Sequence, residues 1–227
     1  MDIVTGTADT LSAGLMFDMA HYRYRVFIEK LGWDLAHRGR LELDQFDRRD
    51  TLYVMARRDG GGLRGVARLL PTSQPYLLGD AFPQLLGGHS PPRDPEVWEL
   101  SRFAAVDIDA NVQDSTRFGA SDEALALLAV AMRAAKQAGA RALVTASPIG
   151  IERILRIAGI TASRLAPPLK VGAHRLFACR IDLVPIVEQG RFACTRVTGV
   201  RGAFNSGGPD RSRLPQRPSC SPPAISP

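Results

Sequence analysis

The most informative stretch of the chain is Trp98-Glu99-Leu100-Ser101-Arg102-Phe103, inside a strand-like run over residues 97–106. It sets charged side chains among apolar ones, and a charge in such a strand is costly unless it is paired or bound to a ligand. Strict alternation along a strand puts Glu99 and Ser101 on one face and Arg102 on the other. If all three face one cleft, the strand must carry a β-bulge or splay near Ser101.

Helix and strand patterns alternate on both sides of this run. The predicted elements are, in order, a helix over 11–31, strands over 51–57, 63–70 and 97–106, a helix over 121–139, a strand over 142–147, a helix over 149–158 and a strand over 176–183. Three glycines at 60–62 mark a hairpin turn, and Ser121 is placed to cap the second helix. This order favours an α/β fold in which helices pack on a mixed sheet.

Composition separates a body from a tail. Of the net charge of +6, the segment from residue 184 carries +4, from six arginines against two acids, which leaves +2 for residues 1–183. We therefore predict one domain over 1–183 and a disordered tail, rich in Pro, Gly, Ser and Arg, over 184–227. A nucleic-acid-binding arm is the alternative interpretation of the tail, but we expect no nucleic-acid partner.

Several classes of protein are not expected from this sequence. No apolar run approaches the ~18 residues of a membrane span, and the N-terminus does not resemble a secretion signal, so we expect a cytoplasmic protein that does not associate with a membrane. Three scattered cysteines and four scattered histidines predict neither a disulfide framework nor a metal site. No phosphate-binding glycine loop is present, and we expect no cofactor.

Charged residues upstream repeat the pattern of the central run. Asp44 and Asp47 flank Phe46, and Arg68 lies inside an apolar strand. One interpretation is that these acids and arginines only pair with one another and hold loops to the sheet. The other is that they form a site for a charged substrate.

The order of these residues resembles the LuxI-type autoinducer synthases over roughly residues 12–183. The positions that carry the resemblance are Arg23, Phe27, Trp33, Asp44, Asp47, Arg68, Glu99, Ser101 and Arg102, and Phe82 also fits. The resemblance implies a fold similar to the GNAT N-acyltransferases, with helices on both faces of a mixed sheet. It also implies an acyl-homoserine-lactone synthase, which acylates the amine of S-adenosylmethionine from acyl carrier protein and then closes a lactone, releasing methylthioadenosine.

The resemblance also assigns roles. Glu99, Ser101 and Arg102 are expected to be catalytic, with Glu99 as the base. The residues expected to bind S-adenosylmethionine are Arg23, Phe27, Trp33, Asp44, Asp47 and Arg68, although Phe27 and Trp33 also fit ordinary core packing. Asp44 and Asp47 suit either the cationic substrate or the ordering of the N-terminal segment.

The acyl chain is expected to contact a later segment. The positions similar to the family's acyl pocket are Thr145, Ser147, Ile151 and Leu155, and Thr145 suits a 3-oxo or 3-hydroxy chain or simply a strand. Acidic acyl carrier protein is expected at basic residues, for which the candidates are Arg133, Lys136, Arg141, Arg153 and Arg156. The alternatives are another GNAT-like acyltransferase that uses acyl-coenzyme A and a catalytically silent binding protein on the same fold.

Overall fold

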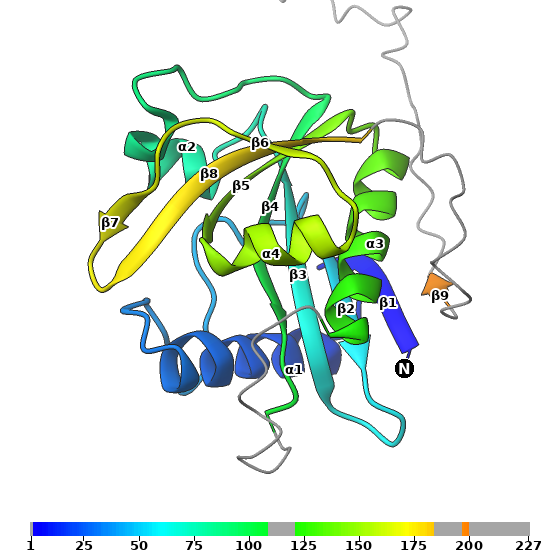
Figure 1. Cartoon of the computed structure of the whole chain (residues 1–227). Coiled ribbons are helices and arrows are strands. Elements are labelled where there is room, and N and C mark those ends of the chain that lie inside the picture. The colour runs from blue at the N-terminus through cyan, green and yellow to red at the C-terminus, as the bar shows by residue number, and fades with distance from the viewer. Residues whose placement is uncertain (1, 109–120, 184–196, 200–227) are drawn as a thin grey trace, which may run out of the picture.

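The computed structural model describes residues 2–108, 121–183 and 197–199 (Figure 1). Its strands are β1 Asp2–Thr7, β2 Leu52–Arg57, β3 Leu63–Pro71, β4 Val97–Ala105, β5 Ala142–Pro148, β6 Ala162–Arg164, β7 Leu169–Val171, β8 His174–Asp182 and β9 Val197–Gly199. Its helical segments are α1 Ala13–Arg23, the π-helical η1 Tyr24–Lys30, α2 Leu77–Asp80, the 3₁₀ turn η2 Pro83–Leu86, α3 Asp122–Gln137 and α4 Gly150–Ile157.

The described strands form one mixed sheet in the order β6-β8-β5-β4-β3-β2-β1-β9, with β7 paired to β8. The central pair β4–β5 and the edge pair β1–β9 are parallel, and the other pairs are antiparallel. The β4–β5 pairing ends at Glu99 opposite Val144, after which β4 continues beside β3 and β5 beside β8. Glu99 therefore lies where the two central strands part.

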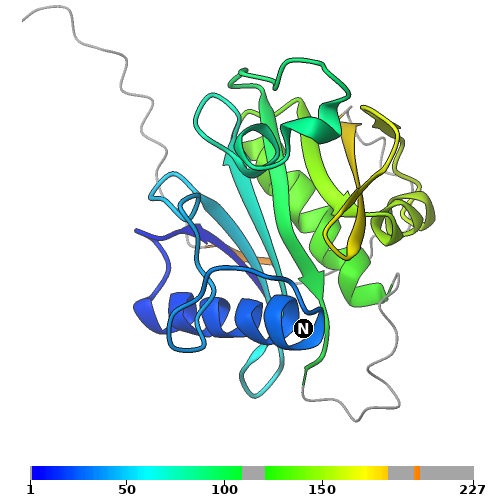
Figure 2. The same ribbon diagram turned by 90° about the vertical axis from the view of Figure 1, so that its left-hand side faces the viewer.

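Helices cover both faces of the sheet, and this confirms the expected fold class (Figure 2). On one face, α1 packs on apolar side chains of β2 and β3 such as Tyr53 and Val66. On the other face, α3 packs on Val54, Leu69 and Leu100, whose side chains alternate with those of the first face. A third cluster lies beneath α2 and η2, against Val97 and Val144.

Local sequence signals account for the helix starts. The Ser12 hydroxyl accepts a hydrogen bond from the Leu15 amide at 3.2 Å, and the Ser121 hydroxyl accepts one from the Ala124 amide at 3.1 Å. Each cap satisfies an amide that has no partner within its helix. The helix predicted over 11–31 begins as α1 but changes after Arg23 to the wider π-helical η1. A π-helical turn inside an α-helix is a frequent feature of functional sites.

Some elements differ from the sequence-based expectation. The strand β1 was not predicted, nor were the short elements α2, η2, β6 and β7. The predicted disorder of residues 184–227 lies outside the described residues, except at 197–199, where β9 pairs with β1 instead. Within the part of the chain that the structure describes, no helix has both the length and the apolar character needed to cross a membrane.

Candidate active site

The strand β4 carries the β-bulge that the charged run requires if Ser101 and Arg102 are to share a face. Val66 of β3 pairs with Ala104, but Arg68 pairs with Ser101, so β4 has one residue more than β3 over this interval. Arg102 has a φ of 50°, in the left-handed region that residues other than glycine rarely adopt. The extra residue turns the Arg102 side chain to the face that carries Glu99 and Ser101. Glu99, Ser101 and Arg102 therefore share one face of the sheet, as a common site for the three side chains requires.

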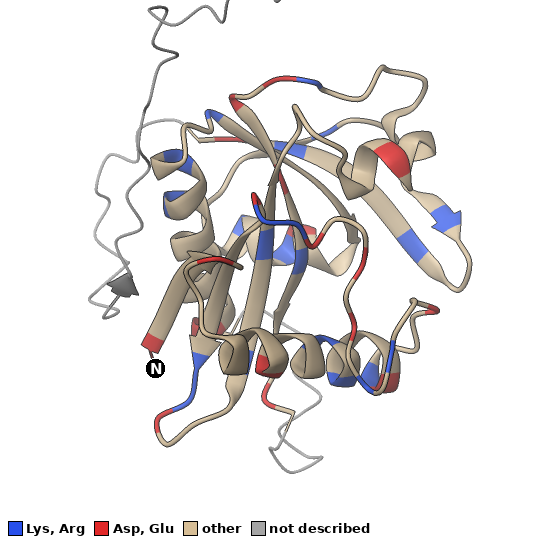
Figure 3. Cartoon of the chain, turned by 180° about the vertical axis from the view of Figure 1, so that it is seen from behind, with Lys and Arg blue, Asp and Glu red and all other residues tan. Residues whose placement is uncertain are grey.

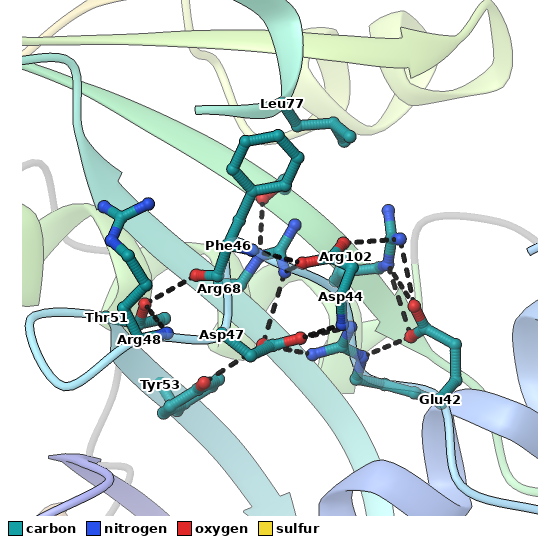
Figure 4. A network of polar contacts seen from close by, with 12 residues as sticks. Glu42, Asp44, Phe46, Asp47, Arg48, Thr51, Tyr53, Arg68, Leu77 and Arg102 are labelled. Carbon is teal, nitrogen blue, oxygen red and sulfur yellow. Dashed lines mark hydrogen bonds and ion pairs between the residues drawn. The ribbon is translucent and has the colours of Figure 1, made fainter. Parts of the chain in front are cut away.

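A buried ion-pair network joins α1 to the segment before β2 (Figure 4). The Arg23 guanidinium is fully buried and donates to Glu42 Oε2 at 2.5 Å and to Asp47 Oδ1 and Oδ2 at 2.7 and 3.1 Å. Asp47 also accepts the Tyr53 hydroxyl at 3.0 Å and the Asp44 amide at 2.8 Å. Burial by itself raises the pKa of the Asp47 carboxyl, but Arg23 and Arg68 outweigh it and hold that pKa below its usual range.

The network continues onto strands β3 and β4. Arg68 Nη1 donates to Asp44 Oδ1 at 2.6 Å, and Arg68 Nε donates to the Ser101 hydroxyl at 3.1 Å. Arg102 donates to both oxygens of Glu42 at 3.0 to 3.3 Å and to Asp44 Oδ2 at 2.9 Å. Three arginines thus face three carboxylates, and the paired charges compensate one another.

One donor in the network is left over. Arg68 is fully buried, yet its Nη2 has no hydrogen-bond partner among the described residues. An unsatisfied buried guanidinium N–H costs free energy, on the order of 1–3 kcal/mol, unless a ligand accepts it. The ion pairs therefore do hold the loop to the sheet, but they also hold Arg68 with one donor free for an acceptor.

Glu99 is the buried carboxyl at the point where β4 and β5 part. Its Oε2 accepts the Leu77 amide at 3.0 Å and its Oε1 accepts the Leu78 amide at 2.6 Å, so it anchors the start of α2. Burial raises the pKa of Glu99 to about 7, although these amides and the positive charges of Arg68 and Arg102 favour the ionised form. A carboxyl that titrates near neutrality can accept and release a proton at physiological pH.

Aromatic side chains lie next to the charged network. The Phe27 ring lies 5.7 Å from the Arg102 guanidinium carbon and packs edge-on against Trp33, with 6.4 Å between ring centres. Trp33 also stacks on His174 of β8, with ring centres 4.7 Å apart. Phe27 is buried, whereas Trp33 and Phe82 are half-buried at the edge of the third cluster. Phe27 and Trp33 thus serve as packing and also border the charged site.

The four residues expected at the acyl chain lie on the opposite face of the sheet from Glu99. Thr145 and Ser147 are both buried and share a hydrogen bond of 2.7 Å between their hydroxyls. They alternate with Val144 and point toward α3 and α4, where Leu155 belongs to the core and Ile151 packs against it. An acyl chain that reaches them from Glu99 has to pass between β4 and β5.

The structure adds residues that the sequence did not single out. Glu42 has no exposed surface and bridges Arg23 and Arg102, while Tyr53 supports Asp47 and His174 supports Trp33. The sequence signal for Glu42 was its place two residues before Asp44 in the same acidic segment. Within the described residues, no group of three or more His, Cys, Asp or Glu side chains is arranged to hold a metal ion.

Comparison with known proteins identifies the family. The family model described as autoinducer synthase matches residues 9–188. The acyl-homoserine-lactone synthase of Acinetobacter nosocomialis is 46% identical over 183 residues, which cover 81% of this chain and 100% of that protein. Among solved structures, TofI in a ternary complex with an inhibitor and MTA superposes with a TM-score of 0.69 and 39% identity, covering 81% of this chain and 92% of that one.

More distant structures set the wider context. The CoA-dependent acyl-homoserine lactone synthase MesI superposes with a TM-score of 0.68 and 28% identity, covering 81% of this chain and 89% of that one. A putative N-acetyltransferase from Lactobacillus plantarum, at 15% identity and a TM-score of 0.52 over 80% of this chain and 97% of that one, shares the fold alone. The bulged strand, the buried network and these likenesses agree. The chain belongs to the autoinducer synthase family and is an acyltransferase, an acyl-homoserine-lactone synthase.

Proposed function

We propose that this enzyme transfers an acyl group from acyl carrier protein to the amine of S-adenosylmethionine and then closes the homoserine lactone with release of methylthioadenosine. The observation that carries the proposal is the buried, unpartnered Nη2 of Arg68 beside the ionisable Glu99. An unpartnered, positively charged donor suits the methionine carboxylate, and a carboxyl with a pKa near 7 suits removal of a proton from the methionine amine.

In the first step, the neutral amine attacks the thioester carbonyl carbon. A C–N bond forms, the C–S bond to the carrier breaks, and the thiolate leaves with the bond's electron pair. The amine proton passes to Glu99, directly or through one water. Each Glu99 oxygen accepts one backbone amide and retains a lone pair for this proton. Arg102, whose Nη1 has no hydrogen bond to a described residue, is a suitable donor to the developing oxyanion.

In the second step, the methionine carboxylate attacks its own γ-carbon. An O–C bond forms and the C–S bond of the sulfonium breaks, with its electron pair left on sulfur in methylthioadenosine. Because a sulfonium is a good leaving group, this step needs mainly a fixed geometry. Hydrogen bonds from Arg68 to the carboxylate and packing against Phe27 and Trp33 would supply it. Asp44 and Asp47 hold the arginines, which supports their role in ordering the site rather than in direct contact with the cation.

The charge distribution supports acyl carrier protein as the donor. The candidate docking residues are all exposed and lie on α3, on α4 and just before β5: Arg133, Lys136, Arg141, Arg153 and Arg156. The blue segments on α3 in Figure 3 mark two of them. Arg153 and Arg156 also border a hollow of about 610 Å³ beside α4. An acidic carrier docked on this side would approach the face that carries Thr145 and Ser147.

Two measurements test the proposal. Mass spectrometry of extracts from a host that expresses the chain should detect homoserine lactones, and Glu99→Gln should abolish them. The purified enzyme, supplied with S-adenosylmethionine and either acyl-acyl carrier protein or the matching acyl-coenzyme A, should prefer the carrier-bound thioester. Equal or better use of acyl-coenzyme A would mean that coenzyme A, not acyl carrier protein, carries the acyl group. The CoA-dependent synthase MesI is an example of that alternative. Absence of lactone with both donors would contradict the proposed function itself.

A further inference from the structure

Glu42 is the least exposed acid of the network, and the proposed reaction does not use it directly. It comes from the segment before β2, not from β4, and its side chain has no exposed surface. Its amide donates to the Ala20 carbonyl of α1 at 3.0 Å, which fixes the backbone on that helix. Its carboxylate then reaches two guanidinium groups that lie far apart in the sequence, those of Arg23 and Arg102.

The contact between Glu42 and Arg102 involves one defined edge of the guanidinium. Arg102 Nε lies 3.2 and 3.3 Å from the two Glu42 oxygens, and Nη2 lies 3.0 Å from Oε1. A carboxylate that engages the Nε/Nη2 edge fixes the plane of the guanidinium as well as its position. The opposite nitrogen, Nη1, then keeps a fixed direction with no hydrogen bond to a described residue.

The backbone at Arg102 makes this support necessary. A φ of 50° is unfavourable for a residue with a Cβ, and such conformations persist only where the surroundings hold them. Asp44 contributes a single bond to Arg102 and is shared with Arg68. Among the described residues, Glu42 supplies the other hydrogen bonds to the Arg102 guanidinium, which also lies over the Phe27 ring, and Glu42 is itself held in place by Arg23.

We propose that Glu42 is a positioning residue that, braced by Arg23, holds the Arg102 guanidinium so that its Nη1 faces the reacting acyl group. This inference rests on the proposed function, because it assigns Arg102 to the developing oxyanion. Glu42 does not touch substrate and acts only through Arg102. Its loss should therefore lower kcat more than it raises KM for S-adenosylmethionine.

The test compares Glu42→Gln with the wild type and with Glu29→Gln, which makes the same change in the exposed pair with Arg40. We expect Glu42→Gln to lower kcat roughly tenfold to a hundredfold, the loss that corresponds to one charge-assisted hydrogen bond, while KM for S-adenosylmethionine changes less than threefold. Glu29→Gln should match the wild type. Lactone production by the wild type tests the proposed function separately from this inference.

A second readout distinguishes positioning from simple stabilisation. Removing the Glu42 charge leaves Arg102 less compensated, which favours the ionised form of Glu99, so the acid limb of the pH–rate profile should move to lower pH. The other charged or titratable neighbours that act on Glu99 are Arg68 and Tyr76, and both remain in the variant. A kcat loss equal to the loss of folded protein, with an unmoved acid limb, would overturn the proposal.

If Glu42→Gln does not fold, a second variant with a shorter acidic side chain tests the proposal. Glu42→Asp keeps the negative charge but lacks one methylene, so it cannot reach both arginines at hydrogen-bond distance. A fall in kcat for this variant, with urea unfolding like that of the wild type, supports positioning. A wild-type kcat would show that only the charge matters and would overturn the proposal.

Discussion

A rise in pH from 5 to 8 should destabilise the folded protein through Glu99. Burial raises the pKa of this carboxyl from its usual 4.5 to about 7, so the folded protein holds the proton more tightly than the unfolded chain does. The stability that the protonated form contributes is fully present below about pH 4.5 and is lost as the pH rises through about 7. This direction is opposite to that of Asp47 and Glu42, whose lowered pKa values affect stability only in more acidic solution.

The magnitude follows from the two pKa values. Their difference, at about 1.36 kcal/mol per unit, corresponds to about 3 kcal/mol, and most of it is lost between pH 5 and pH 8. Glu99→Gln removes the titration. A glutamine offers only one acceptor to the two amides of Leu77 and Leu78, which adds a penalty that does not depend on pH. The pKa of Glu99 is therefore tested by how the difference in unfolding free energy between wild type and Glu99→Gln changes with pH, and not by the size of that difference at one pH.

Urea unfolding of both proteins at pH 5, 6, 7 and 8 measures this change. The free energy of unfolding of the wild type, minus that of Glu99→Gln, should fall by roughly 2–3 kcal/mol over the range. Glu96→Gln, at a half-exposed side chain three residues earlier in the chain, is the matched control for a glutamate-to-glutamine change outside the buried site. A flat difference for Glu99→Gln would mean that Glu99 titrates near its ordinary value. The reasoning that makes it a base near neutrality would then fail.

Three further predictions concern the bulge, the network and the acyl pocket. Arg102→Gly and Arg102→Ala should both lose lactone synthesis, but the glycine variant should be the more stable by about 1 kcal/mol in urea because it tolerates a positive φ; equal stability would argue against strain at this position. Asp47→Asn should lower the free energy of unfolding by about 3 kcal/mol, because it leaves Arg23 and Arg68 undercompensated in the interior, and a loss under 1 kcal/mol would contradict the burial argument. Thr145→Val should shift the products roughly tenfold toward chains without a 3-oxygen, as measured by mass spectrometry, since it removes a buried hydroxyl; an unchanged ratio would place the chain elsewhere.

The sequence was sufficient for most long elements because their apolar periodicity extends over many residues. α3 and β5 lie within two residues of their predicted bounds, and Ser121 caps α3 as expected. The short elements carry too few residues for a periodic signal. The start of the helix α2, for example, depends on the carboxylate of Glu99, which lies on the strand β4. Such a contact exists only in the folded chain.

The candidate site, too, could be predicted from the sequence only in part. Charges inside apolar strands pointed to Arg68 and Arg102, and the resemblance to the autoinducer synthases pointed to Arg23. Neither signal separated Glu42 from the exposed acids, since only tertiary burial does so. Strict strand alternation placed Arg102 on the face opposite Glu99 and Ser101, and the sequence did not show whether a bulge interrupts that alternation. The structure shows an extra residue in β4, whose effect on pairing depends on the register of β3.

The bulge at Arg102 has a second consequence, in the hydrophobic pattern of β4. Before it, the even-numbered Trp98 and Leu100 belong to the core beneath α3, whereas after it the odd-numbered Phe103 and Ala105 pack there. At the bulge, the side chains that face the core thus change from even-numbered to odd-numbered positions. Deletion of a single residue here would turn the core-facing side chains of one half of β4 to the opposite face of the sheet. Reactivity and core formation are therefore tied to the same inserted residue, so a one-residue length change in this run would be expected to damage both.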